Sequence, residues 1–260
     1  MSEVAIPGIE GQRVLVTGGS RGIGRAVCIL LARAGASVGL AYHVAQEEAE
    51  QTLAEAREAA ADDRVRLWAE QTDLSREEDV ARLFERVDEE FGSLDGFVGS
   101  AGVWNPEPLP IGKLEPQAWR TMIDINLTSI YLTGRAAASR IGRGGGIVLL
   151  SSTAAQRGEA DHSHYAASKG AINSFTKSLA TELGPRGITV NAVAPGWVDT
   201  DMSASVLRTD ALDRIVEDIP LRRVASAEDV AGPIVFLLSD LARHVTGEVL
   251  NVNGGSVLCG

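Results

Sequence analysis

The feature that most constrains this chain is a glycine-rich turn between two apolar stretches, 13–17 and 22–31. The first stretch is rich in β-branched residues and predicts a buried strand, and the apolar spacing of the second predicts a helix. Backbone N–H groups at a helix start have no partner within the helix, and the helix dipole favours an anion there. Gly18, Gly22 and Gly24 would let a pyrophosphate approach closely. This spacing differs from G-x-G-x-x-G, so a phosphate-binding turn and a purely structural turn both fit.

Strands and helices are predicted to alternate along the whole chain. This pattern indicates an α/β fold with a doubly wound parallel sheet, a Rossmann fold, in one domain over 1–260. Ligands bind such sheets beyond the carboxyl ends of the strands. The expected strands are 13–17, 37–42, 65–69, 94–98, 146–151, 187–192 and 248–252, and the expected helices are 22–31, 45–61, 75–91, 116–140, 161–184 and 227–239.

The segments that follow the strands are expected to gather at one edge of the sheet. Ser75, with Glu78 three residues later, predicts a capping box at one helix start. A proline-rich loop is expected over 103–115, and irregular or mobile helix over 196–225. The loops expected at the ligand edge are 18–24, 42–46, 73–75, 99–103, 151–158 and 194–200.

Composition excludes several classes of protein. The net charge of −11 argues against a nucleic-acid binder, which normally carries a basic stripe. The two cysteines, Cys28 and Cys259, do not form a metal-ligand spacing, and we expect no metal and a buried thiol at Cys28. No basic segment followed by an apolar core opens the chain, and no apolar run approaches ~20 residues, so we expect a cytoplasmic protein without a membrane span.

Tyr165 and Lys169 are four residues apart in the expected helix 161–184, which places them on one face. A free phenol has a pKa of ~10, and a nearby ammonium lowers that pKa by stabilising the phenolate. Such a tyrosine exchanges a proton with a carbonyl or alcohol oxygen. Ser152, at the end of the fifth strand, offers a hydroxyl to the same oxygen. Taken alone, the pair also fits a surface contact and Ser152 a loop serine.

These motifs together resemble the short-chain dehydrogenase/reductase family over nearly the whole chain. The motifs are Thr17-Gly18-x-x-x-Gly22-Ile23-Gly24, Ser152, Tyr165-x-x-x-Lys169 and Asn191-x-x-x-Pro195-Gly196 with Thr200. The segments 219–223 and 228–231 are most similar to the 3-oxoacyl-carrier-protein reductase-like branch, which also holds sugar, polyol and steroid dehydrogenases. The resemblance therefore implies hydride transfer between a nicotinamide and a carbonyl or secondary alcohol, without fixing the substrate.

The resemblance implies a catalytic tetrad of Asn126, Ser152, Tyr165 and Lys169. Tyr165 would be the general acid in reduction and the base in oxidation, and Ser152 would hold the substrate oxygen. Lys169 would lower the pKa of Tyr165 and bind the nicotinamide ribose. Asn126 would bind a water that links Lys169 to solvent, although a helix-interior amide that bonds its own backbone is the alternative. The family spacing selects Ser152 over Ser151.

The resemblance also implies a set of cofactor-binding residues that follow the strands. Asp73 would accept a hydrogen bond from the adenine amino group, and it can also cap a helix. The expected cofactor residues are Gly18, Ser20, Arg21, Gly22, Ile23, Gly24, Tyr42, His43, Asp73, Leu74, Ser100, Ala101, Gly102, Tyr165, Lys169, Pro195, Gly196, Val198 and Thr200.

The chain departs from the family after the fourth strand, where Asn-Asn-Ala-Gly is usual. Here Gly99-Ser100-Ala101-Gly102 stands instead, so the asparagine side chains that tie adjacent strands and contact the cofactor are missing. We expect altered cofactor affinity or local rigidity, while the small Ala101-Gly102 pair still permits close approach.

The end of the second strand favours NADP(H) over NAD(H). An acid about twenty residues past the glycines would bind the ribose 2′-hydroxyl and repel a 2′-phosphate. No acid is present at the strand end, and Glu47 and Glu48 fall on the next helix. Arg21 is placed to meet a 2′-phosphate with charge-assisted hydrogen bonds, and His43 adds a donor. NAD(H) stays possible, and Arg21 also fits a solvated surface charge.

The resemblance places a mobile substrate lid at about 196–225. Met202, Val206, Leu207 and Leu212 would offer an apolar wall, and Trp104 and Trp197 would flank the same cleft. Trp104 fits a packing anchor and a substrate platform equally well, and Trp119 fits a core or interface position. His162 and His164 precede Tyr165 closely, as helix-start or substrate residues.

Three functions remain open for this pattern. The first is a carbonyl reductase or alcohol dehydrogenase, acting on a 3-oxoacyl thioester, a sugar or polyol, or a cyclic alcohol. The second is a non-catalytic dinucleotide-binding regulator, which would not need the Ser152, Tyr165 and Lys169 set. The third is an isomerase or dehydratase on the same fold. The expected partner is a small-molecule substrate, with neither nucleic acid nor membrane, and the resemblance implies a homotetramer (or a dimer) with 116–140 and 161–184 at one interface.

Overall fold

Seven parallel strands form one sheet in the computed structural model, which describes residues 5–259. The strand order is β3-β2-β1-β4-β5-β6-β7, so the chain winds outward on one side of β1 and then returns to continue from β4 on the other. Such a reversal creates a crevice at the carboxyl ends of the two central strands. The strands are β1 (Arg13–Thr17), β2 (Ser37–Tyr42), β3 (Leu67–Gln71), β4 (Leu94–Gly99), β5 (Ile141–Leu150), β6 (Thr189–Pro195) and β7 (Val249–Val252).

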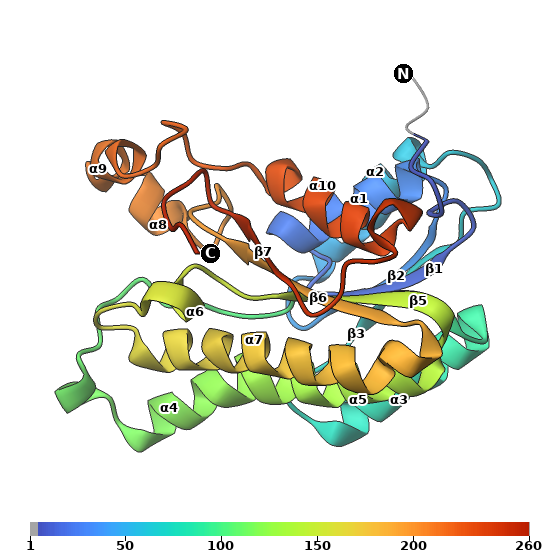
Figure 1. Ribbon diagram of the computed structural model, residues 1–260, viewed down its shortest axis with the longest axis horizontal. Coiled ribbons are helices and arrows are strands. Elements are labelled where there is room, and N and C mark those ends of the chain that lie inside the picture. The colour runs from blue at the N-terminus through green and yellow to red at the C-terminus, as the bar shows by residue number, and fades with distance from the viewer. Residues whose placement is uncertain (1–4, 260) are drawn as a thin grey trace.

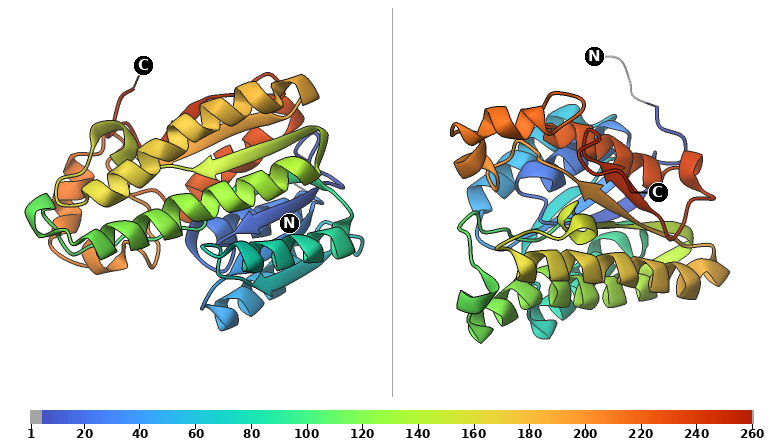
Figure 2. Two further views of the ribbon diagram at one scale, coloured as in Figure 1. Left: turned by 90° about the horizontal axis from the view of Figure 1, so that it is seen from below. Right: turned by 60° about the vertical axis from the view of Figure 1, so that its left-hand side comes forward.

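Helices cover both faces of this sheet. Figure 1 shows α1, α2 and α10 on one face and α3, α5 and α7 on the other. The turned views of Figure 2 show α7 running beside the continuous helical rod of α4 and α5. The helices are α1 (Gly22–Arg33), α2 (Gln46–Ala59), α3 (Glu77–Phe91), α4 (Pro116–Ile123), α5 (Ser129–Arg140), α6 (Ala154–Arg157), α7 (Ser163–Leu183), α8 (Ala204–Leu207), α9 (Ala211–Glu217) and α10 (Ala227–Leu238).

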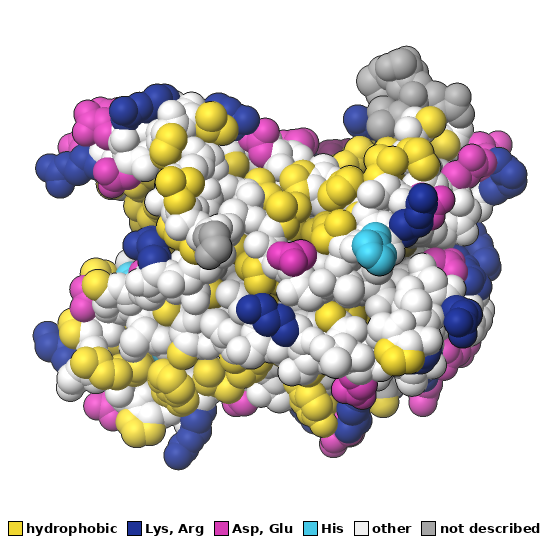
Figure 3. Space-filling view, viewed as in Figure 1, with side chains coloured by type: hydrophobic (Ala, Val, Ile, Leu, Met, Phe, Trp, Pro, Cys, Tyr) yellow, Lys and Arg dark blue, Asp and Glu magenta, His cyan; other side chains and the backbone are white. Residues whose placement is uncertain are grey.

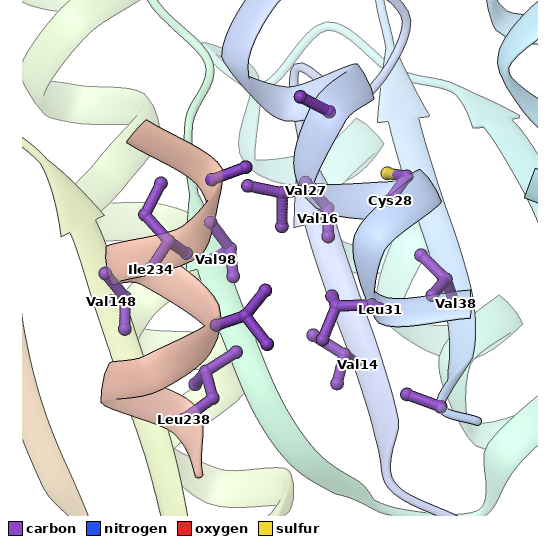
Figure 4. Close-up of a cluster of buried hydrophobic side chains, with 14 of the residues drawn as sticks. Val14, Val16, Val27, Cys28, Leu31, Val38, Val98, Val148, Ile234 and Leu238 are labelled. Atoms are coloured by element: carbon purple, nitrogen blue, oxygen red, sulfur yellow. The ribbon is translucent and has the colours of Figure 1, made fainter. Parts of the chain in front are cut away.

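The two-faced core follows from side-chain alternation along the strands. In β1, Val14 and Val16 pack against α1 and α10, whereas Leu15 points to the opposite cluster under α3 and α5. All three are fully buried. Figure 4 shows the first cluster, in which Val27 and Leu31 of α1 meet the strands. Near-continuous apolar strands are what a parallel sheet covered on both faces requires.

The predicted fold class is confirmed, with local corrections to the expected elements. The strand expected over 65–69 lies at Leu67–Gln71, because the Val65 N–H bonds the Asp62 carbonyl in a turn. The strand expected over 187–192 lies at Thr189–Pro195, because Gly187 has a φ of +72° and ends the preceding turn. The fifth strand begins earlier than the expected Gly146, at Ile141, with a register irregularity between Leu94 and Gly96 of β4.

The capping box expected at Ser75 and Glu78 is wrong. The Ser75 hydroxyl instead donates to Asp73 Oδ1 at 2.6 Å, and α3 begins at Glu77 without a side-chain cap. A capping box does occur at α10, where Ser226 and Asp229 bond each other's backbone. None of the helices within residues 5–259 combines the length and apolar character needed to cross a bilayer.

Candidate active site

A cavity of about 810 Å³ lies at the edge of the sheet where the strands end. It is lined by residues that follow β1, β2, β3, β4, β5 and β6, so the loops expected to gather at one edge do so. Figure 3 shows the surface hollowed on its left side, between the lobe that carries α8 and α9 and the segment that carries α6. Every residue named above for cofactor binding lines this cavity.

The glycine-rich turn has the backbone geometry of an anion cradle. Gly18 has a φ of +69°, and a Cβ there would lie 2.8 Å from the Ala101 Cα atom. A Cβ at Gly24 would lie 2.2 Å from the Gly18 carbonyl oxygen. The Thr52 hydroxyl donates to the Ser20 carbonyl at 3.0 Å and holds the turn from α2. The turn therefore brings bare backbone and the start of α1 to the cavity, which fits the pyrophosphate of a dinucleotide.

The outer end of the cavity carries basic side chains and one carboxylate. Arg21 and His43 are exposed there, and Arg21 has no ion-pair partner among the described residues. Asp73 Oδ1 accepts hydrogen bonds from the Ser75 N–H and hydroxyl, which lower the pKa of Asp73. Glu47 and Glu48 lie on α2 and do not line the cavity, as expected. An acid at the end of β2 is therefore absent from this end of the site.

Ser152, Tyr165 and Lys169 converge at the inner end of the cavity. The Lys169 ammonium donates to the Leu150 carbonyl at 2.9 Å and lies 5.9 Å from the centre of the Tyr165 ring. The Ser152 hydroxyl accepts from the Ala154 N–H at 3.1 Å and acts on the Tyr165 hydroxyl, whose pKa it lowers. Ser151, by contrast, is buried and turns its hydroxyl to the Lys169 carbonyl at 3.3 Å. The geometry thus favours Ser152 over Ser151 for contact with a ligand.

The pKa of Tyr165 is shifted opposite to the expected direction. Burial raises the pKa of Tyr165 to about 12, the Ser152 hydrogen bond opposes this rise, and the negative charge of Glu159 adds to it. Burial also lowers the pKa of Lys169 to about 8. Lys169 does not contribute to the shift in the pKa of Tyr165, because its ammonium donates a hydrogen bond to the Leu150 carbonyl instead of the phenol. The expected lowering of the pKa of Tyr165 by Lys169 is therefore wrong for this arrangement.

Asn126 lies in a π-helical turn, Asp124–Thr128, within the rod of α4 and α5. Its amide donates to the Val103 carbonyl at 2.8 Å and accepts from the Val103 N–H at 2.7 Å. It does not line the cavity, but a Cβ at Gly102 would lie 3.2 Å from Asn126 Oδ1 and 3.3 Å from the Lys169 ammonium. Asn126 therefore ties the loop after β4 beside Lys169, and its amide does not bond the backbone of its own helix as the alternative from the sequence had it. π-turns of this kind are frequent at functional sites.

The space beside Gly99 explains the departure from the family's asparagine. A Cβ at Gly99 would lie 2.9 Å from terminal methyl groups of Ile130 and Leu149. Both of those side chains are fully buried, so a Cβ there would require them to shift within the packed core. The core of this chain fills the volume that the asparagine would occupy.

Trp104 and Trp197 both line the cavity, as expected. Their rings meet edge to face at 5.7 Å, and Trp104 also stacks on His162 at 5.3 Å. Trp104 is thus both a packing anchor and part of the cavity lining. His162 and His164 are buried and do not line the cavity.

Of the four residues expected as an apolar wall, only Met202 lines the cavity within the described part of the chain. Leu207 is buried elsewhere, Leu212 is exposed, and Val206 is half-buried.

Trp119 is 39% exposed on α4, which excludes a core position in this chain. Cys28 is buried as expected, and burial raises the pKa of its thiol.

Sequence reasoning missed four charged residues of the lining, Asp124, Arg157, Glu159 and Asp201. Arg157 and Glu159 lie between β5 and α7, at and just beyond the end of the expected loop 151–158. The position of Glu159 six residues before Tyr165 was the available indication that it would approach the site.

Known proteins match this chain over nearly all of its length. The family model described as enoyl-(acyl carrier protein) reductase matches residues 18–256. A 3-oxoacyl-[acyl-carrier-protein] reductase FabG of Staphylococcus epidermidis is 35% identical over 246 residues, 94% of this chain and 98% of that protein. A 3alpha-hydroxysteroid dehydrogenase of Mediterraneibacter gnavus is 37% identical over 250 residues, 95% and 98% of the two chains. The structure of a short chain dehydrogenase from Burkholderia cenocepacia in complex with NADP has a TM-score of 0.88 and 35% identity, with 95% of this chain and 98% of that chain covered.

The parallel sheet, the glycine turn and the cavity define a dinucleotide-binding α/β protein. With matches of this extent, the chain belongs to the short-chain dehydrogenase/reductase family, in its FabG-like branch. It is accordingly an NAD(P)-dependent oxidoreductase.

Proposed function

We propose that this protein moves hydride between a nicotinamide and a carbonyl or secondary alcohol carbon, with Tyr165 as the general acid in reduction. The observation that carries the proposal is the meeting of Ser152, Tyr165 and Lys169 at the inner end of a cavity whose outer end is the glycine turn. The bound nicotinamide would supply or accept the hydride. The cavity volume of about 810 Å³ lies within the range of small-molecule and cofactor sites.

The proton chemistry falls to three side chains. Ser152 and Tyr165 present two hydroxyl groups to one substrate oxygen, which polarises a carbonyl and fixes its orientation. Tyr165 then donates its phenolic proton to the oxygen in reduction and accepts it in oxidation. A pKa near 12 keeps the phenol protonated at neutral pH, but it makes the phenol a weaker acid and leaves little phenolate to act as a base. Both roles therefore gain when the Lys169 ammonium approaches the phenol oxygen and lowers this pKa. Lys169 would make that approach from its bond to Leu150, and it would also hold the nicotinamide ribose. Asn126, beside Lys169, would hold a water on the path to solvent.

The cofactor preference that we propose is NADP(H). Arg21 is exposed at the outer end of the cavity without an ion-pair partner in residues 5–259, and no acid of β2 reaches that end. A solved relative bound to NADP supports the same preference. Asp73 keeps one carboxylate oxygen without a hydrogen bond from the described residues 5–259 and is placed to accept from the adenine amino group.

Carbonyl reduction of the 3-oxoacyl-[acyl-carrier-protein] type is the reaction favoured by the first relative, whereas the steroid dehydrogenase shows a different substrate at similar identity.

We propose the single domain over 1–260 and a lid over 196–225, supported by Thr200 and Met202, which reach the cavity from that segment. A homotetramer is supported by the exposed Trp119 and Tyr131 on α4 and α5. The cytoplasmic location stays a prediction.

A substrate panel with NADPH absorbance, run with Tyr165→Phe, tests the proposal. We expect NADPH oxidation with at least one ketone, reduced ~10²-fold or more in the variant, while the Kd for NADPH stays within about threefold. NADPH binding without turnover on a broad carbonyl and alcohol panel would favour the regulator instead. Product formation without net cofactor change would favour the isomerase or dehydratase.

A further inference from the structure

Glu159 places a carboxylate in the cavity wall, in the short segment between α6 and α7. Its side chain is only 17% exposed. The Trp104 indole N–H donates to Glu159 Oε1 at 3.2 Å, and His162 Nδ1 lies 3.6 Å from the same oxygen. The other oxygen, Oε2, has no hydrogen-bond partner within residues 5–259 and is not fully buried, in a residue that lines the cavity. One half of a well-held carboxylate is therefore open to a ligand.

A rigid aromatic frame fixes this carboxylate. Trp104 stacks on His162 with an interplanar angle of 28° and meets Trp197 at 90°. The His162 Nδ1 donates to the Ala160 carbonyl at 3.0 Å, which holds the ring in place. The three rings come from segments after β4, β5 and β6, so the sheet itself sets their positions. A binding group held by packed neighbours keeps its geometry without a ligand.

A structural role for Glu159 accounts for only one of its oxygens. A half-buried indole N–H needs one acceptor, and Oε1 provides it. No lysine or arginine within residues 5–259 forms an ion pair with Glu159, and its one ionic neighbour, His162, is charged only if protonated. The Glu159 charge is felt at the reacting end, since it raises the pKa of Tyr165. Arg157 also lines the cavity, but it is exposed and does not contribute to the shift in the pKa of Tyr165.

Building on the function proposed above, we propose that Glu159 is a substrate-recognition residue that selects hydroxyl- or ammonium-bearing carbonyl substrates over anionic ones. Oε2 accepts a hydrogen bond from the substrate's donor group, and Trp104 and Trp197 contact its flat apolar face. A carboxylate or phosphate at the same place faces a like charge in a partly desolvated wall and leaves Oε2 without a donor. Charge-assisted hydrogen bonds and cation–π contact favour an ammonium group most.

Three ketones of one shape but different charge test this assignment. They are 4-acetylbenzoate, 4-acetylbenzamide and 4-(aminomethyl)acetophenone, each reduced with NADPH at pH 7 and low ionic strength. For the wild-type protein we expect kcat/KM for the ammonium and amide probes to exceed that for the benzoate at least tenfold. Glu159→Gln keeps an oxygen that can accept from Trp104 but loses the charge. We expect it to lower the ratio of ammonium to benzoate at least tenfold.

Two control variants separate recognition from structure. Asp161→Asn removes an equal charge from an exposed residue that does not line the cavity, and asparagine tolerates its φ of +62°. We expect this variant to keep the ratio within twofold. Glu159→Asp keeps the charge and is expected to keep the order of the three probes. An equal loss for all three probes in Glu159→Gln would show that Glu159 only anchors Trp104, and would overturn the assignment.

Binding gives a second readout that does not depend on turnover. The probes are titrated into NADP⁺-loaded protein while tryptophan fluorescence is followed, because Trp104 and Trp197 line the site. If none of the probes is reduced but their Kd order moves in Glu159→Gln, the proposed reaction fails and the recognition role stands. If all are reduced with an order unchanged in Glu159→Gln, or the benzoate is preferred throughout, the recognition role fails and the reaction stands.

Discussion

Replacing Lys169 with methionine should lower activity and raise the free energy of unfolding by an amount that depends on pH. Lys169 is 5% exposed, and burial lowers the pKa of its ammonium from 10.5 to about 8. The unfolded chain keeps this proton up to about pH 10.5, whereas the folded chain releases it near pH 8. Between these values the unfolded state binds more protons, so the free energy of unfolding rises with pH. Lys169 therefore destabilises the fold below pH 8 and ceases to do so above about pH 10.5.

The size of this effect follows from the pKa shift. At 1.36 kcal/mol per pKa unit, a fall from 10.5 to about 8 corresponds to roughly 3 kcal/mol of lost stability at pH 7. Methionine keeps the length of the side chain and carries no charge. It gives up the hydrogen bond to the Leu150 carbonyl, and that loss does not vary with pH. The pH-dependent part of the difference thus isolates the buried ammonium.

Urea unfolding measures the pH-dependent difference in the free energy of unfolding between wild type and Lys169→Met. Both proteins are studied without cofactor, at one protein concentration and at pH 7, 8, 9 and 10. We expect the stability of the variant relative to wild type to fall by about 2–3 kcal/mol between pH 7 and pH 10. Titrations shared by the two proteins cancel in this difference. Tyr165, with a pKa raised to about 12, acts in the opposite direction only above pH 10. If the difference in the free energy of unfolding between the two proteins does not change over this pH range, the conclusion that burial destabilises the Lys169 ammonium is refuted.

Two further predictions concern the departure after β4 and the cofactor. Gly99→Asn, which restores the usual family residue, should destabilise the protein by about 1–3 kcal/mol in chemical denaturation, because its Cβ would lie 2.9 Å from Ile130 and Leu149. Gly112→Asn, at a position where nothing lies within 4 Å, is the matched control, and an equal effect of the two would contradict the packing argument. Arg21→Ala should weaken NADP⁺ binding about 10- to 100-fold through the loss of charged hydrogen bonds, and NAD⁺ binding by less than about threefold. Titration calorimetry checks this, and equal losses for the two cofactors would remove Arg21 from the 2′-phosphate site.

The parts of the fold that depend on local patterns were predictable. The bounds of β1 and β2 follow from short apolar runs ended by glycine or polar residues, and they agree with the sequence prediction. The edge strand β3 lies two residues later, because the turn at Asp62 and Val65, not the apolar run, decides where pairing with β2 begins. The long helix expected over 116–140 is continuous in outline, but its π-turn at Asn126 depends on bonds to Val103, distant in sequence.

The gathering of the site residues was also predictable, but their electrostatics were not. Loops that follow parallel strands must meet at one edge, so Arg21, Ser152 and Tyr165 share a cavity as expected. The direction of the pKa shift of Tyr165 depends on how deeply the phenol is buried and on where the Lys169 ammonium points. Neither is encoded in a four-residue spacing.

Transfer of deuterium to a ketone from NADPH that carries deuterium in place of both hydrogens of the nicotinamide C4 tests the central claim most directly. We predict one deuterium on the carbinol carbon of the product for wild type. In Tyr165→Phe the rate of transfer should fall ~10²-fold or more, with an unchanged Kd for NADPH. Unlabelled product, or transfer at the wild-type rate in Tyr165→Phe, would contradict the proposal that this phenol donates the proton in a hydride transfer.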